Sequence, residues 1–96
     1  NTLISTSTKV KEEKPKLYKV ILLNDDYTPM EYVVILLKKV FNKSENEAVN
    51  IMLMVHKKGV GVCGIYTKEI AETKVVTVLK MAKSDQHPLK CIMEEE

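Results

Sequence analysis

The stretch LYKVILLNDDYTPME, residues 17–31, holds one strand, one turn and the start of one helix. Its first seven residues are mostly aliphatic, which is typical of a strand. The Asn and Asp residues that follow favour a turn, because their side chains bond to nearby backbone groups. Thr28 and Glu31 match a T-x-x-E capping box, and Pro29 suits the first helical position. We therefore expect a strand over 17–23 that turns directly into a helix.

The rest of the chain continues with helical and strand patterns in turn. Apolar residues at helical spacing predict a first helix over about 29–42. Ser44 and Glu47 form a second capping box, and Gly59 is placed for a left-handed cap at the end of that second helix. In GVGVCGIYT, residues 59–67, glycines recur inside an apolar run, which predicts a strand with a bulge or a close backbone approach.

A third helix is predicted from Thr67 to about Ala82, and HPLKCIM, residues 87–93, is expected to form the last strand. The final residues EEE would then be a solvated tail. This order of strand, helix, helix, strand, helix, strand predicts a two-layer α+β fold, with the helices on one face of a small sheet. Residues 1–16 are rich in Ser, Thr, Lys and Glu, so we expect a flexible N-terminal arm there, followed by one domain over 17–96.

The composition argues against several classes of function. All 15 basic residues are Lys and the net charge is only +2, so the Arg forks that recognise guanine and phosphate are missing. No stretch approaches the roughly 20 apolar residues of a membrane span. Cys63 and Cys91 belong to no CxxC pair, which favours buried reduced thiols over a zinc site. We expect no nucleic acid, membrane, metal or cofactor as a partner.

Polar acceptors and apolar side chains are expected to meet at one end of the first two helices. If these helices pack as an antiparallel hairpin, His56 at the end of the second returns toward the start of the first. The cleft between them would have an acceptor rim and an apolar wall, formed by Asn24, Asp25 and His56 and by Met30, Val33, Met52 and Val55. Carboxylate, amide and neutral imidazole groups accept hydrogen bonds, and Met adapts to varied apolar shapes. Such a cleft suits the first residue of a polypeptide.

Almost the whole stretch from Lys16 to Glu94 resembles ClpS, the adaptor that delivers N-degron substrates to a ClpA- or ClpC-type AAA+ unfoldase of the Clp protease. The matching segments are YKVILLNDDYTPMEYV (18–33), MLMVHKKG (52–59), CGIYTKEIAETKV (63–75) and HPLKC (87–91). The resemblance implies a three-stranded antiparallel sheet under three helices. It also implies a protein that is not an enzyme and that binds N-terminal Leu, Phe, Tyr or Trp.

The resemblance assigns the matching residues to three sets. The substrate's α-amino group is received by Asn24, Asp25 and His56. The pocket for its side chain is lined by Thr28, Met30, Met52, Val55 and Leu89, to which the expected cleft adds Val33. The unfoldase is contacted by Glu69 and Lys74. Met30 is implied as a gate that excludes β-branched first residues. Within the turn, we expect Asn24 and Asp25 to face the ligand, and Asp26 and Thr28 to shape the backbone.

Two other functions remain open from the residues alone. The C-terminal domain of the bacterial ribosomal stalk protein is similar in element order, so the chain could be a non-degron interaction module of the same fold. Asp25, Asp26 and His56 could instead serve a hydrolase as metal ligands or acid–base groups, although no nucleophile–base pair accompanies them. The all-Lys basic set is typical of an AT-rich genome, so a bacterial cytoplasm and a plastid-type organelle both fit.

Overall fold

The computed structural model describes residues 14–96; most of the expected N-terminal arm, residues 1–13, lies outside the described residues. The elements follow the predicted order: β1 (Leu17–Leu23), α2 (Met30–Phe41), α3 (Glu45–Lys58), β2 (Val60–Thr67), α4 (Lys68–Ser84) and β3 (Lys90–Glu95).

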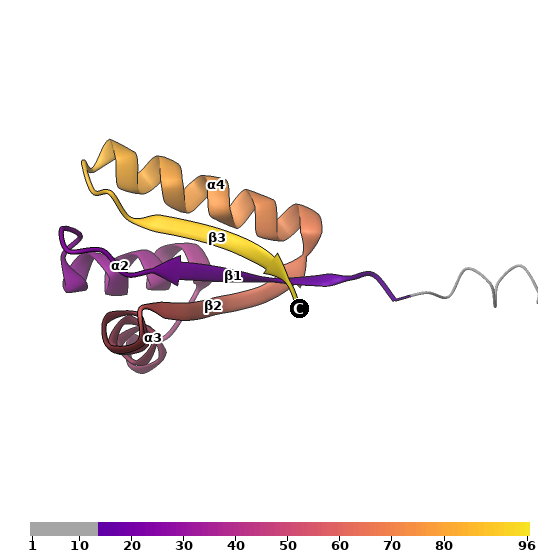
Figure 1. The fold of residues 1–96 in the computed structure, drawn as a ribbon, viewed down its shortest axis with the longest axis horizontal. Helices are drawn as coiled ribbons and strands as arrows, with labels where there is room; N and C mark the ends of the chain where they lie inside the picture. Colours follow the sequence, from indigo (N-terminus) through magenta and orange to yellow (C-terminus); the bar gives the residue numbers. More distant parts are fainter. Residues whose placement is uncertain (1–13) are drawn as a thin grey trace, which may run out of the picture.

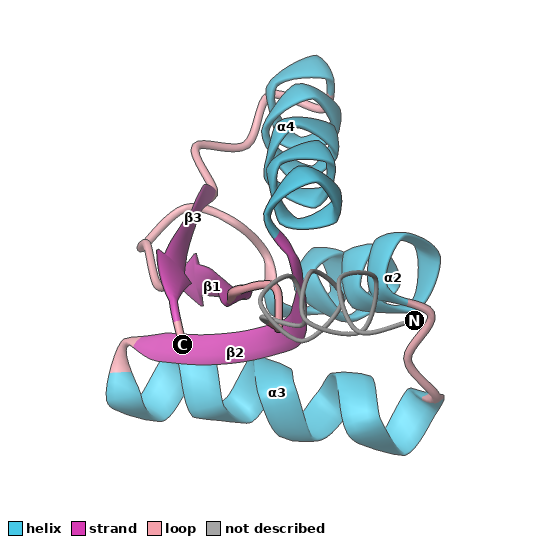
Figure 2. Ribbon diagram, turned by 90° about the vertical axis from the view of Figure 1, so that its right-hand side faces the viewer, coloured by secondary structure: helices cyan, strands magenta, loops and turns pink. Residues whose placement is uncertain are grey.

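The three strands form one sheet in the order β2-β1-β3, and both neighbouring pairs are antiparallel. β1 therefore lies in the centre. In the view of Figure 1, α2 passes behind the sheet, α4 lies along its β3 edge at the top, and α3 lies along its β2 edge at the bottom. Figure 2 shows α3 running beneath β2 and α2 on one side of the sheet. The expected fold, a three-stranded antiparallel sheet packed under three helices, is confirmed.

The hydrophobic core lies between this sheet and the helices. Successive side chains of a strand point to opposite faces, and Val20 and Leu22 of β1 are fully buried on the helical side. Both cysteines belong to this core, and both are free thiols. Burial raises the pKa of each thiol to about 12, so the predicted inert core thiols are found. The other buried members of the core are Val33, Leu36, Leu37, Phe41, Ala48, Val55, Ala71, Val78, Ala82 and Leu89.

The glycine-rich strand β2 shows both features that its sequence predicted. Its pairing with β1 shifts between Val20, which faces Gly64, and Ile21, which faces Val62, so Cys63 is left over as a bulge. The close approach occurs elsewhere in the strand, where β2 packs against the last turns of α3. An ideal Cβ at Gly61 would lie only 2.6 Å from Cγ2 of a valine of α3. Glycine therefore allows α3 to seat directly on the sheet.

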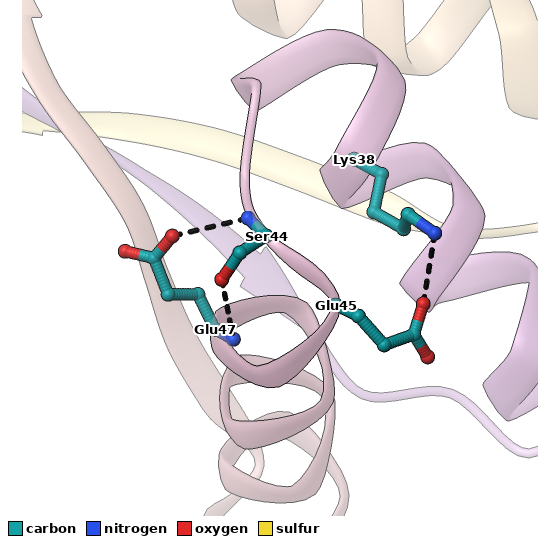
Figure 3. Close-up of polar contacts among 4 residues, drawn as sticks. All are labelled: Lys38, Ser44, Glu45 and Glu47. Carbon is teal, nitrogen blue, oxygen red and sulfur yellow. Dashed lines mark hydrogen bonds and ion pairs between the residues drawn. The ribbon is translucent and has the colours of Figure 1, made fainter.

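The corner between α2 and α3 is built from local signals that the sequence displayed. Ser44 Oγ accepts a hydrogen bond from the Glu47 N–H at 3.2 Å, and Glu47 Oε1 accepts one from the Ser44 N–H at 3.0 Å. Figure 3 shows this capping box beside an ion pair between Lys38 Nζ and Glu45 Oε1, which are 2.8 Å apart. At the other end of α3, Gly59 adopts φ 88° and caps the helix as predicted.

The first capping box was predicted wrongly. α2 begins at Met30, and its N-cap is Pro29, which has no side-chain acceptor. Within the described chain, no side chain caps this helix. The hydroxyl of Thr28 is buried beside Asp25 instead of bonding to the N–H of Glu31. The reason is that Asp25 has already fixed the backbone of the turn, as described below.

The last strand was also placed too early, because β3 begins at Lys90 rather than at His87. Gln86 adopts a left-handed conformation with φ 62°, and the His87 N–H donates to the Ala82 carbonyl at 2.8 Å. These contacts end α4 and use the backbone donor that a strand would need. Residues 87–89 therefore form a loop that leads into β3.

The acidic C-terminal residues were expected to be a solvated tail, but two of them belong to β3. Glu94 pairs with Lys19 and Glu95 with Tyr18 in the ladder with β1. Opposite charges face each other on these strands, with 3.7 Å between Lys19 Nζ and Glu94 Oε1 and the same distance between Lys16 Nζ and Glu95 Oε1. Cross-strand pairs of this kind stabilise a register modestly.

Candidate functional site

A cavity of about 210 Å³ opens where the turn after β1, the last turn of α3 and the loop before β3 converge. Its lining contains every residue that the sequence predicted for the ligand site. It also contains two residues that were not predicted to face a ligand, Leu23 and Asp26. The complete lining is Leu23, Asn24, Asp25, Asp26, Thr28, Met30, Val33, Met52, Val55, His56 and Leu89.

Asp25 builds the turn that forms one side of this cavity. Its Oδ1 accepts hydrogen bonds from the Tyr27 N–H at 2.8 Å and the Thr28 N–H at 2.7 Å. Such side-chain acceptors stabilise turns by satisfying backbone donors locally. The expectation that Asp26 and Thr28 shape the turn holds only for Thr28, whose N–H donates to Asp25. Asp25 supplies the acceptor, and Asp26 is exposed and lines the cavity.

The second carboxylate oxygen of Asp25 serves no such purpose. Asp25 Oδ2 and Thr28 Oγ1 are both buried, and neither has a hydrogen-bond partner of good geometry in the described part of the chain. Burial alone would raise the pKa of Asp25. Hydrogen bonds from Thr28 and Tyr27 and the charge of His87 outweigh it, so the pKa lies below its ordinary value of 3.8. The cavity therefore contains an ionised oxygen beside the Thr28 hydroxyl, and this oxygen can accept a further donor.

Asn24 and His56 bring two further acceptors to the rim from different elements. Asn24 is exposed, and its N–H donates to the Gly59 carbonyl at 2.9 Å. This bond ties the turn after β1 to the end of α3, whose last turn carries the exposed His56. The predicted convergence of the start of α2 with the end of α3 is thus present. Its consequence is a rim of acceptors around one opening.

The inner wall of the cavity is apolar. Val33 of α2, Val55 of α3 and Leu89 of the loop before β3 are buried there. Met52 is half-buried beside them, and Met30 is 44% exposed in the first turn of α2. An exposed Met that also lines the cavity stands at its mouth, where a flexible thioether can adapt to different occupants. The site thus combines an anionic rim with an apolar interior.

Residues 13–92 match the family model described as ATP-dependent Clp protease adaptor protein ClpS. The chain belongs to the ClpS family. The ClpS adapter protein of Hyphomonas neptunium is 58% identical over 93 residues, which cover 97% of this chain and 79% of that protein. That of Parvibaculum lavamentivorans is 60% identical over 95 residues, which cover 99% of this chain and 86% of that protein.

A solved structure agrees with this assignment. The structure of Agrobacterium tumefaciens ClpS2 bound to L-phenylalaninamide superposes with a TM-score of 0.84 at 43% sequence identity. It covers 86% of this chain and 100% of that chain. The likeness therefore covers most of the chain, and the family fold implied by the sequence is the one observed. The ribosomal stalk alternative rested on element order alone, which this family shares.

Two residues that the ClpS resemblance assigned to the unfoldase, Glu69 and Lys74, lie on the first turns of α4, outside this cavity. Glu69 is exposed. Lys74 is half-buried, and its ammonium donates a hydrogen bond to the Val40 carbonyl at 2.7 Å. The same nitrogen lies 5.9 Å from the ring centroid of Phe41 and 5.7 Å from that of Tyr66. A separate surface hollow of about 600 Å³ is lined by Lys39, Val40, Glu69, Ile70, Thr73, Lys74 and Thr77.

The hydrolase alternative drew on Asp25, Asp26 and His56 as metal ligands or acid–base groups. Over residues 14–96, no group of three or more His, Cys, Asp or Glu side chains is arranged to hold a metal ion. In the same residues, no helix has the length and apolar character needed to cross a bilayer.

Sequence reasoning missed part of the surroundings of the ClpS-like cavity. Leu23 could have been found, because it directly precedes Asn24 at the end of the apolar strand. His87 also had a signal, since it lies two residues before the predicted wall residue Leu89. The hydrogen bond from the Tyr32 hydroxyl to Asp85 joins residues 53 positions apart, and nothing in the local pattern predicted it.

Proposed function

We propose that this protein is a non-enzymatic adaptor that binds polypeptides through a large hydrophobic N-terminal residue, namely Leu, Phe, Tyr or Trp, and delivers them to a ClpA- or ClpC-type unfoldase. One observation carries the proposal: a buried, ionised carboxylate oxygen of Asp25, which makes no hydrogen bond of standard geometry within residues 14–96, lines a cavity whose inner wall is apolar. Buried polar atoms almost always have partners. The strongest partner for a carboxylate is a cationic N–H donor, and an α-ammonium group is such a donor.

The dimensions of the cavity support a ligand of one residue. Sites for drug-sized molecules measure roughly 300–1,000 Å³, whereas this cavity measures about 210 Å³. The acceptors stand at the rim and the apolar groups lie inside, so an N-terminal residue would place its ammonium on Asp25 and its side chain among Val33, Val55 and Leu89. L-phenylalaninamide, to which the Agrobacterium protein is bound, has the same two chemical features.

Delivery requires a second surface, and we assign it to the hollow beside the start of α4. Glu69 is exposed there and free to meet a partner's cation. Lys74 has a double role in this proposal, because its ammonium already bonds to the Val40 carbonyl at the end of α2. Charged groups at the edge of an interface act mainly on the rate of encounter, so the contact should weaken as salt is raised.

The relatives named above are bacterial adaptor proteins. They favour a bacterial cytoplasm over the plastid alternative and an adaptor over an enzyme. In this proposal the protein acts only by binding: Asp25, Asn24 and His56 hold the terminal amine, and the polypeptide leaves intact.

The test is a titration with two peptides that start with Phe and differ only in N-terminal acetylation. Acetylation removes the positive charge and strands the acceptors of Asp25 and its neighbours. A charge-assisted hydrogen bond contributes roughly 1.5–3 kcal/mol, so the acetylated peptide should bind at least about tenfold more weakly. Equal affinities would refute the proposal.

A matched pair of variants sharpens this test. Asp25→Asn keeps an oxygen for the Tyr27 and Thr28 N–H groups while removing the charge, so the turn survives and the affinity for the free amine should fall. Asp26→Asn removes a neighbouring charge that is exposed at the cavity mouth. It should change the affinity much less.

A further inference from the structure

Two residues outside the cavity lining connect α2 to the end of α4. Tyr32 is the third residue of α2, and Asp85 directly follows α4. The Tyr32 hydroxyl donates a hydrogen bond to Asp85 Oδ2 across 53 positions of sequence. The pKa of Tyr32 is raised to about 12, mainly by burial and then by the hydrogen bond to Asp85 and the negative charge of Asp85. The phenol therefore keeps its proton, and the bond persists, throughout the neutral pH range.

The ring of Tyr32 also fixes the next residues of the loop. The imidazole of His87 meets it edge to face, with 4.3 Å between the ring centroids and 62° between the planes. Such an arrangement is favoured between aromatic rings. The backbone N–H of His87 donates to the Ala82 carbonyl at 2.8 Å. His87 is therefore held by the end of α4 on one side and by the first turn of α2 on the other.

The loop that this pair holds becomes a wall of the ligand cavity after two more residues. Pro88 has a fixed φ, which makes the step from His87 to Leu89 stiff. Leu89 is only 4% exposed and lines the cavity. Before it, Gln86 adopts a left-handed conformation that is unfavourable for a residue with a Cβ. A loop with such a residue needs contacts elsewhere to keep its shape.

We propose that Tyr32 and Asp85 form a latch that positions the loop 86–89, so that Leu89 stands at the depth that suits an aromatic ligand side chain. The proposal rests on the proposed function, since it concerns selectivity within the same cavity. Tyr32 and Asp85 line no part of the cavity. They are positioning residues that act through Leu89. The same loop holds His87 close enough for its charge to contribute to the low pKa of Asp25.

The expected signature is a change in the ratio of two affinities. A Phe side chain is larger and reaches more of the wall than a Leu side chain does, so it loses more when Leu89 is no longer held in place. Tyr32→Phe removes only the hydroxyl and keeps the ring against His87. The loss of one hydrogen bond allows the loop to shift. Affinity for a Phe-initiated peptide should fall about fivefold and that for a Leu-initiated peptide less than about twofold.

Three further variants separate positioning from a loss of folding. Asp85→Ala should reproduce the change in the Phe-to-Leu ratio, whereas Asp85→Asn keeps an acceptor for the phenol and should restore it. Tyr66→Phe is the matched control, because it removes a hydroxyl from β2 at a distance from the latch. A variant that was merely less stable would lower both affinities together and leave their ratio unchanged.

The latch also has a spectroscopic signature. Ultraviolet titration follows tyrosine ionisation, and Asp85→Ala should shift one tyrosine to lower pH than in the wild type, which the Tyr32→Phe/Asp85→Ala double variant should not show. Wild-type protein that binds neither peptide would overturn this proposal and the proposed function together. Wild-type protein that binds both, with the same Phe-to-Leu ratio in Tyr32→Phe and Asp85→Ala, would overturn the latch alone.

Discussion

Substitution of Gly61 by Ala should be among the most damaging single-methyl changes in this fold. The added Cβ would lie 2.6 Å from Val55 Cγ2, whereas ordinary contacts begin at 3.4 Å, so about 0.8 Å of retreat is needed. Rotation of Val55 cannot supply all of it, because the backbone oxygen of Ile51 lies 3.2 Å from the same Cβ. The whole of α3 must therefore move away from β2. Overpacking of this kind costs roughly 1–3 kcal/mol.

The predicted loss of about 2 kcal/mol should lower the melting temperature by roughly 8–16 °C in a domain of this size. It should also weaken peptide binding at temperatures where the variant is fully folded, because Val55 lines the cavity. Denaturant unfolding gives the free energy, and a titration with a Phe-initiated peptide gives the affinity.

Gly59→Ala is the matched control for Gly61→Ala. An added Cβ at Gly59 meets no described heavy atom within 4 Å, but its φ of 88° is unfavourable for Ala. The cost is then conformational, about 1 kcal/mol, with no push on the cavity wall. If the free energy of unfolding of Gly61→Ala lies within about 0.5 kcal/mol of the wild-type value, α3 does not pack on β2 as described. The cavity geometry argued from that seating would then be wrong.

The remaining predictions concern the two ends of the molecule. Met30→Ala should admit peptides that begin with Ile or Val while still binding Leu and Phe, because a smaller gate clears a branched Cβ. Equal loss of all four in titrations would show that Met30 supports the cavity without selecting among first residues. Lys74→Met should lower the free energy of unfolding by about 1 kcal/mol through the lost bond to Val40, with unchanged peptide affinity. The stability difference between wild type and Asp25→Asn should be constant above about pH 5 and shrink as pH falls below 3.8. The contacts that lower the pKa of Asp25 stabilise only its ionised form, so their contribution is lost as Asp25 takes up a proton. A constant difference in acid unfolding curves would contradict this.

The two capping boxes show what the local sequence can and cannot predict. Ser44 and Glu47 bond as their spacing predicts, each side chain accepting the backbone N–H of the other residue. Thr28 and Glu31 have the same spacing, yet no cap forms between them. The difference arises three residues upstream, where Asp25 takes the Thr28 N–H for its own turn. A pattern read in isolation therefore failed where the preceding turn used the same backbone donor.

Errors at the C-terminus have a different physical origin, namely the pairing of strands distant in sequence. Three consecutive glutamates are unfavourable in a strand by propensity. Glu94 and Glu95 nevertheless extend β3, because the register with β1 places lysines where their carboxylates can reach them. The sequence signals for the ligand site were stronger, since its residues cluster in short segments beside predicted helix ends. The bond between Tyr32 and Asp85 had no such signal.

The position of α4 explains how one small domain can present two surfaces without conflict. At 1.5 Å per residue, Glu69 and Asp85 are separated by about 24 Å along the helix axis. The Asp85 end joins α2 beside the ligand cavity, and Figure 1 shows the start of α4 at the opposite end of the sheet from the turn between β1 and α2. The proposed unfoldase surface and the peptide cavity therefore share no residue. Because sites this far apart without shared partners are normally independent, both can be occupied at once, which is the condition that delivery of a bound polypeptide requires.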